Sequence, residues 1–187
     1  TPKVFCGPTG ECYEDRAVAM HVTIPARYSA QIGIVNIFRQ GGGDAVSFPE
    51  PGFRVTQCEV NGVRQNFYDY ITARGVDWRL PLVADFCGAM VNVSVQGLDA
   101  GARAVDLYAP VFEGVTYRFA APVENYAAQF AGAIPSAVKG PVFTCNCVLN
   151  YVYGSLEGRS TGDMVGPMTF GEIAYQLLNQ TMVYITV

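Results

Sequence analysis

The sequence predicts an α+β protein, with a largely antiparallel or mixed sheet covered by about three helices. Segments with the alternating apolar pattern of strands recur along the chain. A few other segments instead space their apolar residues every three or four positions, as helices do. Half of the 187 residues are hydrophobic and only 15% are charged, so the chain can bury a substantial core.

The strand segments are rich in β-branched residues and are bounded by Pro, Ser, Gly or Asn. The segment 53–62 ends at Asn61-Gly62, a dipeptide that favours a tight hairpin turn. Two later strands flank Gly114, and we expect them to form a hairpin with each other. The expected strands are residues 19–25, 30–38, 53–62, 89–95, 104–112, 115–122, 140–147 and 181–187.

Four segments carry helix signals. The first, 65–75, ends at Gly75, and the second, 122–135, begins at Pro122. A short helix is expected to begin at Asn146 or Asn150 and to end at Gly154 or Gly158. The last, 168–180, opens with a capping box in which Glu172 follows Thr169 by three positions.

The chain is expected to form a single compact domain over residues 1–187. Three glycines and two prolines make residues 40–52 the best candidate boundary within it. Residues 1–52 would then be an N-terminal β subregion, and residues 53–187 the remainder.

Composition argues against several classes of partner. The net charge is −4 and no run of Lys or Arg is present, so we expect no nucleic-acid partner. No apolar run approaches the length of a membrane span, and no signal peptide is visible. We therefore expect a cytoplasmic protein with reduced thiols, in which Cys6 and Cys12 are the pair most able to close a local disulfide loop.

The motif Cys145-Asn146-Cys147 is the most conspicuous candidate for chemistry. A zinc site needs about four converging ligands, and His21 is the only histidine, so we expect no metal and no cofactor. A reactive thiol needs a partner that lowers its pKa. The remaining interpretation is that the cysteines are small apolar residues packed at the end of a strand.

Several polar residues lie in apolar surroundings. A buried polar group left without a hydrogen bond costs about 1–3 kcal/mol, so each must pair with the backbone or contact a ligand. The sequence does not decide between these roles. The residues are Asn92, Asn146, Asn150, Arg159, Glu172 and Asn179.

The C-terminal third resembles the C-terminal part of FIST-type sensory domains. The resemblance rests on a strand ending in a Cys-containing segment, a glycine and a Phe-Gly-Glu-Ile element. The matching residues are Phe143, Cys145, Cys147, Gly166, Thr169, Phe170, Gly171, Glu172 and Ile173. The resemblance extends over residues 53–187 and implies a module that senses small molecules in bacterial signal transduction.

Together these observations favour a non-catalytic module that binds a small polar or anionic metabolite. The site would combine the strand end with the free N–H groups at the start of the last helix. Its expected residues are Cys145, Asn146, Cys147, Asn150, Arg159, Thr169, Phe170, Gly171 and Glu172. Two alternatives stay open: a thiol-dependent enzyme using Cys145 or Cys147, and a structural domain that forms a homodimer through an edge strand such as residues 181–187.

Overall fold

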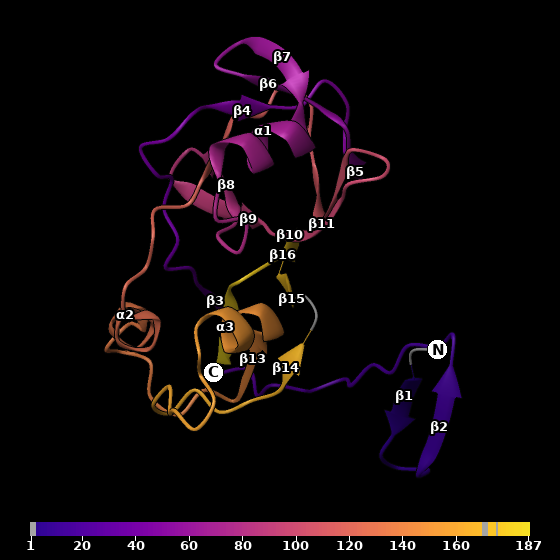
Figure 1. Cartoon of the computed structure of the whole chain (residues 1–187). Helices are drawn as coiled ribbons and strands as arrows, with labels where there is room; N and C mark the ends of the chain where they lie inside the picture. Colours follow the sequence, from indigo (N-terminus) through magenta and orange to yellow (C-terminus); the bar gives the residue numbers. More distant parts are fainter. Residues whose placement is uncertain (1–2, 170–171, 175) are drawn as a thin grey trace. The chain divides into compact units, whose positions relative to one another are not determined.

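The computed structural model describes residues 3–169, 172–174 and 176–187 (Figure 1). Its contacts divide the chain into two units, Thr1–Ala30 and Gln31–Val187. Residues 31–52 therefore belong with the larger unit, and the division falls upstream of the glycine-rich segment expected as a boundary. Within its described residues the protein has a mixed α/β composition, with several antiparallel sheets and three helices.

The small unit contains one hairpin, formed by β1 (Lys3–Cys6) and β2 (Glu11–Glu14). Cys6 lies opposite Glu11 and Cys12 lies opposite Phe5, so the two thiols project from opposite faces. Both cysteines are free, and this register does not bring their thiols together. Residues 19–25 were expected as a strand, but they form no ladder, and that prediction is wrong.

The larger unit contains a six-stranded antiparallel sheet in the order β7-β6-β4-β12-β8-β9. At Asn61 and Gly62 φ is 50° and 80°, which confirms the predicted tight turn between β6 and β7. The strands of this sheet are β4 (Val46–Ser47), β6 (Gln57–Val60), β7 (Val63–Asn66), β8 (Leu82–Phe86), β9 (Ala89–Val93) and β12 (Tyr117–Phe119).

A three-stranded sheet, in the order β10-β11-β5, lies on the same core. Its strands are β5 (Gly52–Val55), β10 (Val95–Asp99) and β11 (Ala104–Val111). The hairpin expected around Gly114 is wrong, because β11 pairs with β10 and β5 whereas β12 pairs with β4 and β8. The chain at Gly114 therefore crosses from one sheet to the other.

The helix α1 (Phe67–Arg74) packs against β7 and β11, and it confirms the first predicted helix. Asn66 caps its first turn by accepting a hydrogen bond from the N–H of Asp69, and Gly75 ends it with φ 60°. Phe67 is fully buried, and its ring meets the Phe48 ring edge-on at a centroid distance of 5.1 Å. Phe67 also stacks on Phe119 of β12, so aromatic packing joins the helix to the six-stranded sheet.

A four-stranded sheet, in the order β14-β13-β17-β3, forms a second centre of packing. Its strands are β3 (Gln31–Val35), β13 (Phe143–Cys147), β14 (Met168–Thr169) and β17 (Met182–Thr186). Since β17 lies between β13 and β3, the expectation that residues 181–187 form an edge strand is wrong. Ile32 and Ile34, which share one face of β3, are 44% and 43% exposed.

Helices α2 (Tyr126–Ala133) and α3 (Val148–Tyr153) contribute to this second core, where Tyr126 and Phe130 pack with Tyr184. The helix α2 begins after Pro122, because Asn125 caps it by accepting a hydrogen bond from Ala128 N–H. Gly154 follows the last residue of α3, as one of the two predicted ends. No helix among the described residues is long and apolar enough to cross a lipid bilayer.

The helix predicted over residues 168–180 is wrong. The described residues there form β14 and a hairpin of β15 (Glu172–Ala174) and β16 (Gln176–Leu178). Ala174 and Leu178 are four positions apart, a spacing that suits a helix, but here they reach Val183 from two paired strands. Pairing of β14 with β13, and of β15 with β16, has overridden the local capping signal.

Candidate functional site

The predicted cysteine motif lies at the end of β13, beside β14. Cys147 pairs with Thr169 in parallel register, and Cys145 Sγ lies 3.3 Å from Thr169 Oγ1. The structure therefore brings the cysteines and Thr169 together. It does so through strands, so the argument for an anion at a helix N-terminus at Thr169 no longer holds.

The two asparagines expected beside the cysteines are buried and serve the backbone. Asn150 donates hydrogen bonds to Asn146 Oδ1 at 2.8 Å and to the carbonyl of Thr181 at 3.2 Å. The N–H of Cys147 reaches the same carbonyl at 3.1 Å. Together these bonds fix the chain at Thr181 against α3.

The other predicted ligand residues lie elsewhere or outside the described part. Arg159 is exposed in the loop after α3, where its N–H bonds to the carbonyl of Leu156 at 3.0 Å. Glu172 begins β15, and Phe170 and Gly171 lie outside the described residues.

A second buried network holds the preceding residues of the same segment. The Asn36 and Asn92 side-chain amides bond to each other in both directions, at 3.0 and 3.1 Å. Asn92 also donates to the carbonyl of Asn179 at 3.1 Å, and Asn179 Oδ1 accepts the N–H of Ser94 at 3.2 Å. Residues 179–181 are thus tied to β9, α3 and the end of β13 by buried polar side chains.

Gln180 is held at the centre of this segment in a conformation that non-glycine residues seldom adopt. Its φ is 48°, and its side chain is almost fully buried. Its Oε1 accepts the hydroxyl of Ser94 at 2.7 Å, and its Nε2 donates to the carbonyl of Arg79 at 3.3 Å. Backbone strain of this kind persists where the surroundings enforce it, and it often marks a functional position.

Gln180 lines a cavity of about 250 Å³. Three aromatic residues, Phe38, Tyr126 and Tyr153, form much of its wall. At its rim Arg79 and Asp77 form an ion pair with an N–O distance of 2.8 Å. The hydrogen bond from Arg79 lowers the pKa of the Asp77 carboxyl, so the rim carries both charges at neutral pH. The remaining lining residues are Leu80, Pro122 and Val123.

Most of this cavity was not foreseen from the sequence. The prediction named Asn179 but not its neighbour Gln180, and it gave no role to the Asp77-Trp78-Arg79 segment. Tyr126 falls within the helix predicted over residues 122–135, for which no ligand contact is predicted. The one local signal for this cavity in the sequence is the acidic Asp77 two positions before the basic Arg79, on a short loop.

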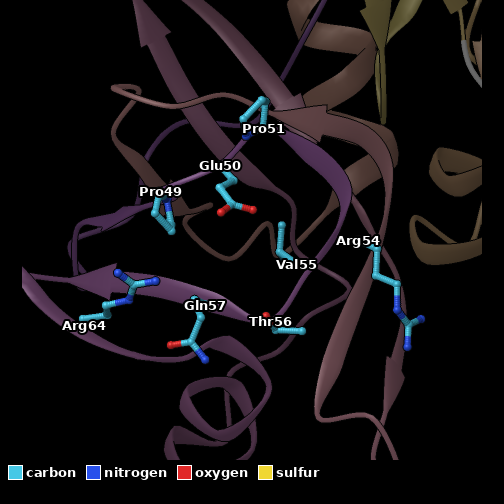
Figure 2. A pocket seen from close by; sticks show the side chains of 8 residues that line it. All are labelled: Pro49, Glu50, Pro51, Arg54, Val55, Thr56, Gln57 and Arg64. Carbon is cyan, nitrogen blue, oxygen red and sulfur yellow. The ribbon is translucent and has the colours of Figure 1, made fainter.

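A smaller cavity of about 160 Å³ lies beside β5 and β6 (Figure 2). Figure 2 shows the Arg54 side chain turned away from Glu50 and Arg64. Arg54 is also engaged, because it pairs with Asp99 at 2.6 Å and Asp106 at 2.8 Å. This cavity is smaller than the one at Gln180 and has no aromatic wall, so it offers a ligand less apolar surface.

The burial of the thiols yields a test of the enzyme alternative. Cys147 is fully buried, and burial raises the pKa of the equally buried Cys58 thiol to about 12. In native protein treated with a chromogenic disulfide reagent, we expect the exposed Cys12 and Cys87 to react at least about 100-fold faster than Cys58 and Cys147. Peptide mapping of the labelled protein measures this. Rapid labelling of Cys145 or Cys147 at neutral pH would instead favour a thiol nucleophile.

The described residues hold no group of three or more His, Cys, Asp or Glu side chains arranged to bind a metal ion.

No curated protein and no solved structure matches the chain. A family model does match, over residues 1–187, and its description is a family of unknown function, DUF6976. Because the match covers the whole sequence, the chain belongs to the DUF6976 family.

Proposed function

We propose that this protein is a non-catalytic module that binds a small polar or anionic metabolite in the cavity at Gln180. The observation that carries the proposal is the combination of an aromatic-walled cavity, a charged rim and a strained, buried glutamine in one place. Ligand sites typically combine apolar walls with a few fixed polar groups in this way.

The walls and volume indicate the size and shape of the ligand. The cavity volume of about 250 Å³ is just below the 300–1,000 Å³ common for ligand sites. Rings of Phe38 and Tyr126, whose centroids lie 6.2 Å apart, offer flat apolar surface. A compact molecule with one planar or apolar part therefore fits best.

The polar groups indicate the chemistry of the ligand. A carboxylate or phosphate on the ligand could share the Arg79 guanidinium with Asp77, since a guanidinium has five N–H donors. The side-chain amide of Gln180 bonds to Ser94 Oγ and to the Arg79 carbonyl, which fixes the orientation of its polar atoms near the cavity. Fixed donors of this kind select polar ligands without needing to move on binding.

A sensory role is part of the same proposal. Gln180 lines the cavity and sits in the segment that the Asn92 and Asn150 networks tie to two sheets. A ligand that prefers one arrangement of this segment would shift the population of that arrangement. The cytoplasmic setting also belongs to the proposal, and the six free cysteines support it.

Replacement of Arg79 by alanine tests the site. We expect Arg79→Ala to weaken binding of an anionic metabolite about 10-fold or more, because a charge-assisted hydrogen bond is lost. The ligand is first sought by ligand-observed NMR with a library of carboxylated and phosphorylated metabolites, and affinities are then measured by calorimetry.

Arg103→Ala is a matched control. Arg103 is exposed to a similar degree and pairs with a single aspartate, Asp69, but it does not line the cavity. Equal losses in both variants would show that the effect is one of overall charge. Absence of any binder in the library, or binding unchanged by Arg79→Ala, would contradict the proposal.

A further inference from the structure

The segment between β2 and β3 exposes an unusual amount of apolar surface. Val18, Met20 and Val22 are 51%, 84% and 65% exposed, and they alternate along the chain. In an extended strand, residues two apart project from the same face, so these three side chains would form one apolar stripe. We call residues 17–24 the arm.

One face of the four-stranded sheet is apolar and largely open. Ile32 of β3 aligns with Ile185 of β17, and Ile185 aligns with Phe143 of β13, so these side chains share one face. Phe143 is 47% exposed, similar to Ile32 and Ile34. Among the described residues, the hairpin of β15 and β16 covers Val183 on this face, and Thr169 lies beside Cys145.

The edge of this face is also open. Among the described residues β3 pairs only with β17, so its other side presents unpaired N–H and C=O groups. Such an edge is a template for an added strand, and proteins usually protect it with charge, proline or a short length. Residues 31–35, QIGIV, contain none of the charged or proline residues that would do so.

We propose that the arm of one copy adds as a strand to the β3 edge of a second copy, with its stripe on the open face. Residues 16–25 form no ladder within their own chain. The backbone N–H and C=O groups of the arm are therefore free to pair with the β3 edge of a second copy.

The area at stake suits a dimer. The exposed parts of the arm's stripe and of the open face amount together to roughly 700 Å², and reciprocal exchange of two arms buries roughly 1,400 Å², which is within the range of stable interfaces. Two exchanged arms also form a closed, two-fold symmetric contact, in which each copy donates and receives one strand.

Charge placed on the stripe should disrupt the assembly. We expect sedimentation velocity to show the unmodified full chain as a dimer at micromolar concentration, and Val22→Glu to raise its dissociation constant at least about 100-fold, because a carboxylate would be buried without a partner. Ile34→Lys, on the receiving face, should have a similar effect. Val63→Glu is the control, because Val63 is also 65% exposed but lies at the β6–β7 turn.

Photo-crosslinking separates exchange from self-pairing. A photoreactive residue replaces Met20 in a chain of natural isotope content, and that protein is mixed with ¹⁵N-labelled chain before irradiation. Crosslinks from the light arm to heavy β3 or β13 peptides are expected. Crosslinks confined to light peptides, or a monomer at all concentrations, would overturn the proposal, as would equal dissociation by Val22→Glu and Val63→Glu.

Discussion

Replacement of Asn92 by alanine is expected to lower the free energy of unfolding by about 3 kcal/mol. Asn92 is fully buried and bonds to Asn36 and to the carbonyl of Asn179. Its removal leaves part of the Asn36 amide and the Asn179 carbonyl without partners in the core, and each such group costs about 1–3 kcal/mol. Denaturant unfolding followed by tryptophan fluorescence measures the change.

Two further variants define the cause. Asn125→Ala removes one exposed hydrogen bond, to Ala128 at the start of α2, and is expected to cost only about 1 kcal/mol.

Asn92→Asp keeps the shape but buries an acid, whose pKa in the folded state is raised above its unfolded value of about 3.9. The folded state of this variant then binds the proton more tightly than the unfolded state does. Its loss of stability relative to the unmodified protein is therefore small below about pH 3.9 and grows as the pH rises above that value. A loss independent of pH, or equal losses for Asn92→Ala and Asn125→Ala, would contradict the network's assigned role.

Replacement of Gly166 by alanine is expected to cost about 3 kcal/mol through crowding. A methyl group at Gly166 would collide with the carbonyl and the hydroxyl of Thr144 in β13. Thr144 is buried and its backbone pairs with β17, so it cannot easily retreat. The measurement is the midpoint of thermal unfolding, together with amide exchange across β13.

Gly42→Ala provides the comparison for Gly166→Ala. No atom lies within 4 Å of a methyl group built at Gly42, and its φ is not in the left-handed region, so we expect little change or a slight gain in stability. If Gly166→Ala is as stable as Gly42→Ala, the loop before β14 can move away from β13.

The sequence predicted elements whose determinants are local. The Asn61-Gly62 turn and helix α1, with its cap at Asn66 and end at Gly75, depend on residues within a few positions of each other. The predictions failed where distant pairing decides the outcome. The capping box at Thr169 was overridden by pairing of β14 with β13, and the expected hairpin at Gly114 by the division of β11 and β12 between two sheets.

The candidate site was only partly visible for the same reason. The burial of Asn92, Asn146, Asn150 and Asn179 follows from their apolar surroundings, and the structure places all four in hydrogen-bonded networks. The cavity at Gln180 is built from residues as far apart as Phe38 and Gln180, which no short motif connects. The resemblance to FIST-type sensory domains stays a prediction, as does the sensory role that it implies.

The order of strands in the two sheets has a consequence for biosynthesis. The six-stranded sheet draws only on residues 46–119, so its pairing partners leave the ribosome within one continuous stretch. The four-stranded sheet needs Met182–Thr186 at its centre, and until those residues are made β3 and β13 have nothing to join them. In nascent chains we therefore expect the six-stranded sheet to form before the four-stranded sheet. Until β17 has been synthesised, apolar residues such as Ile32 and Phe143 are available for binding by chaperones.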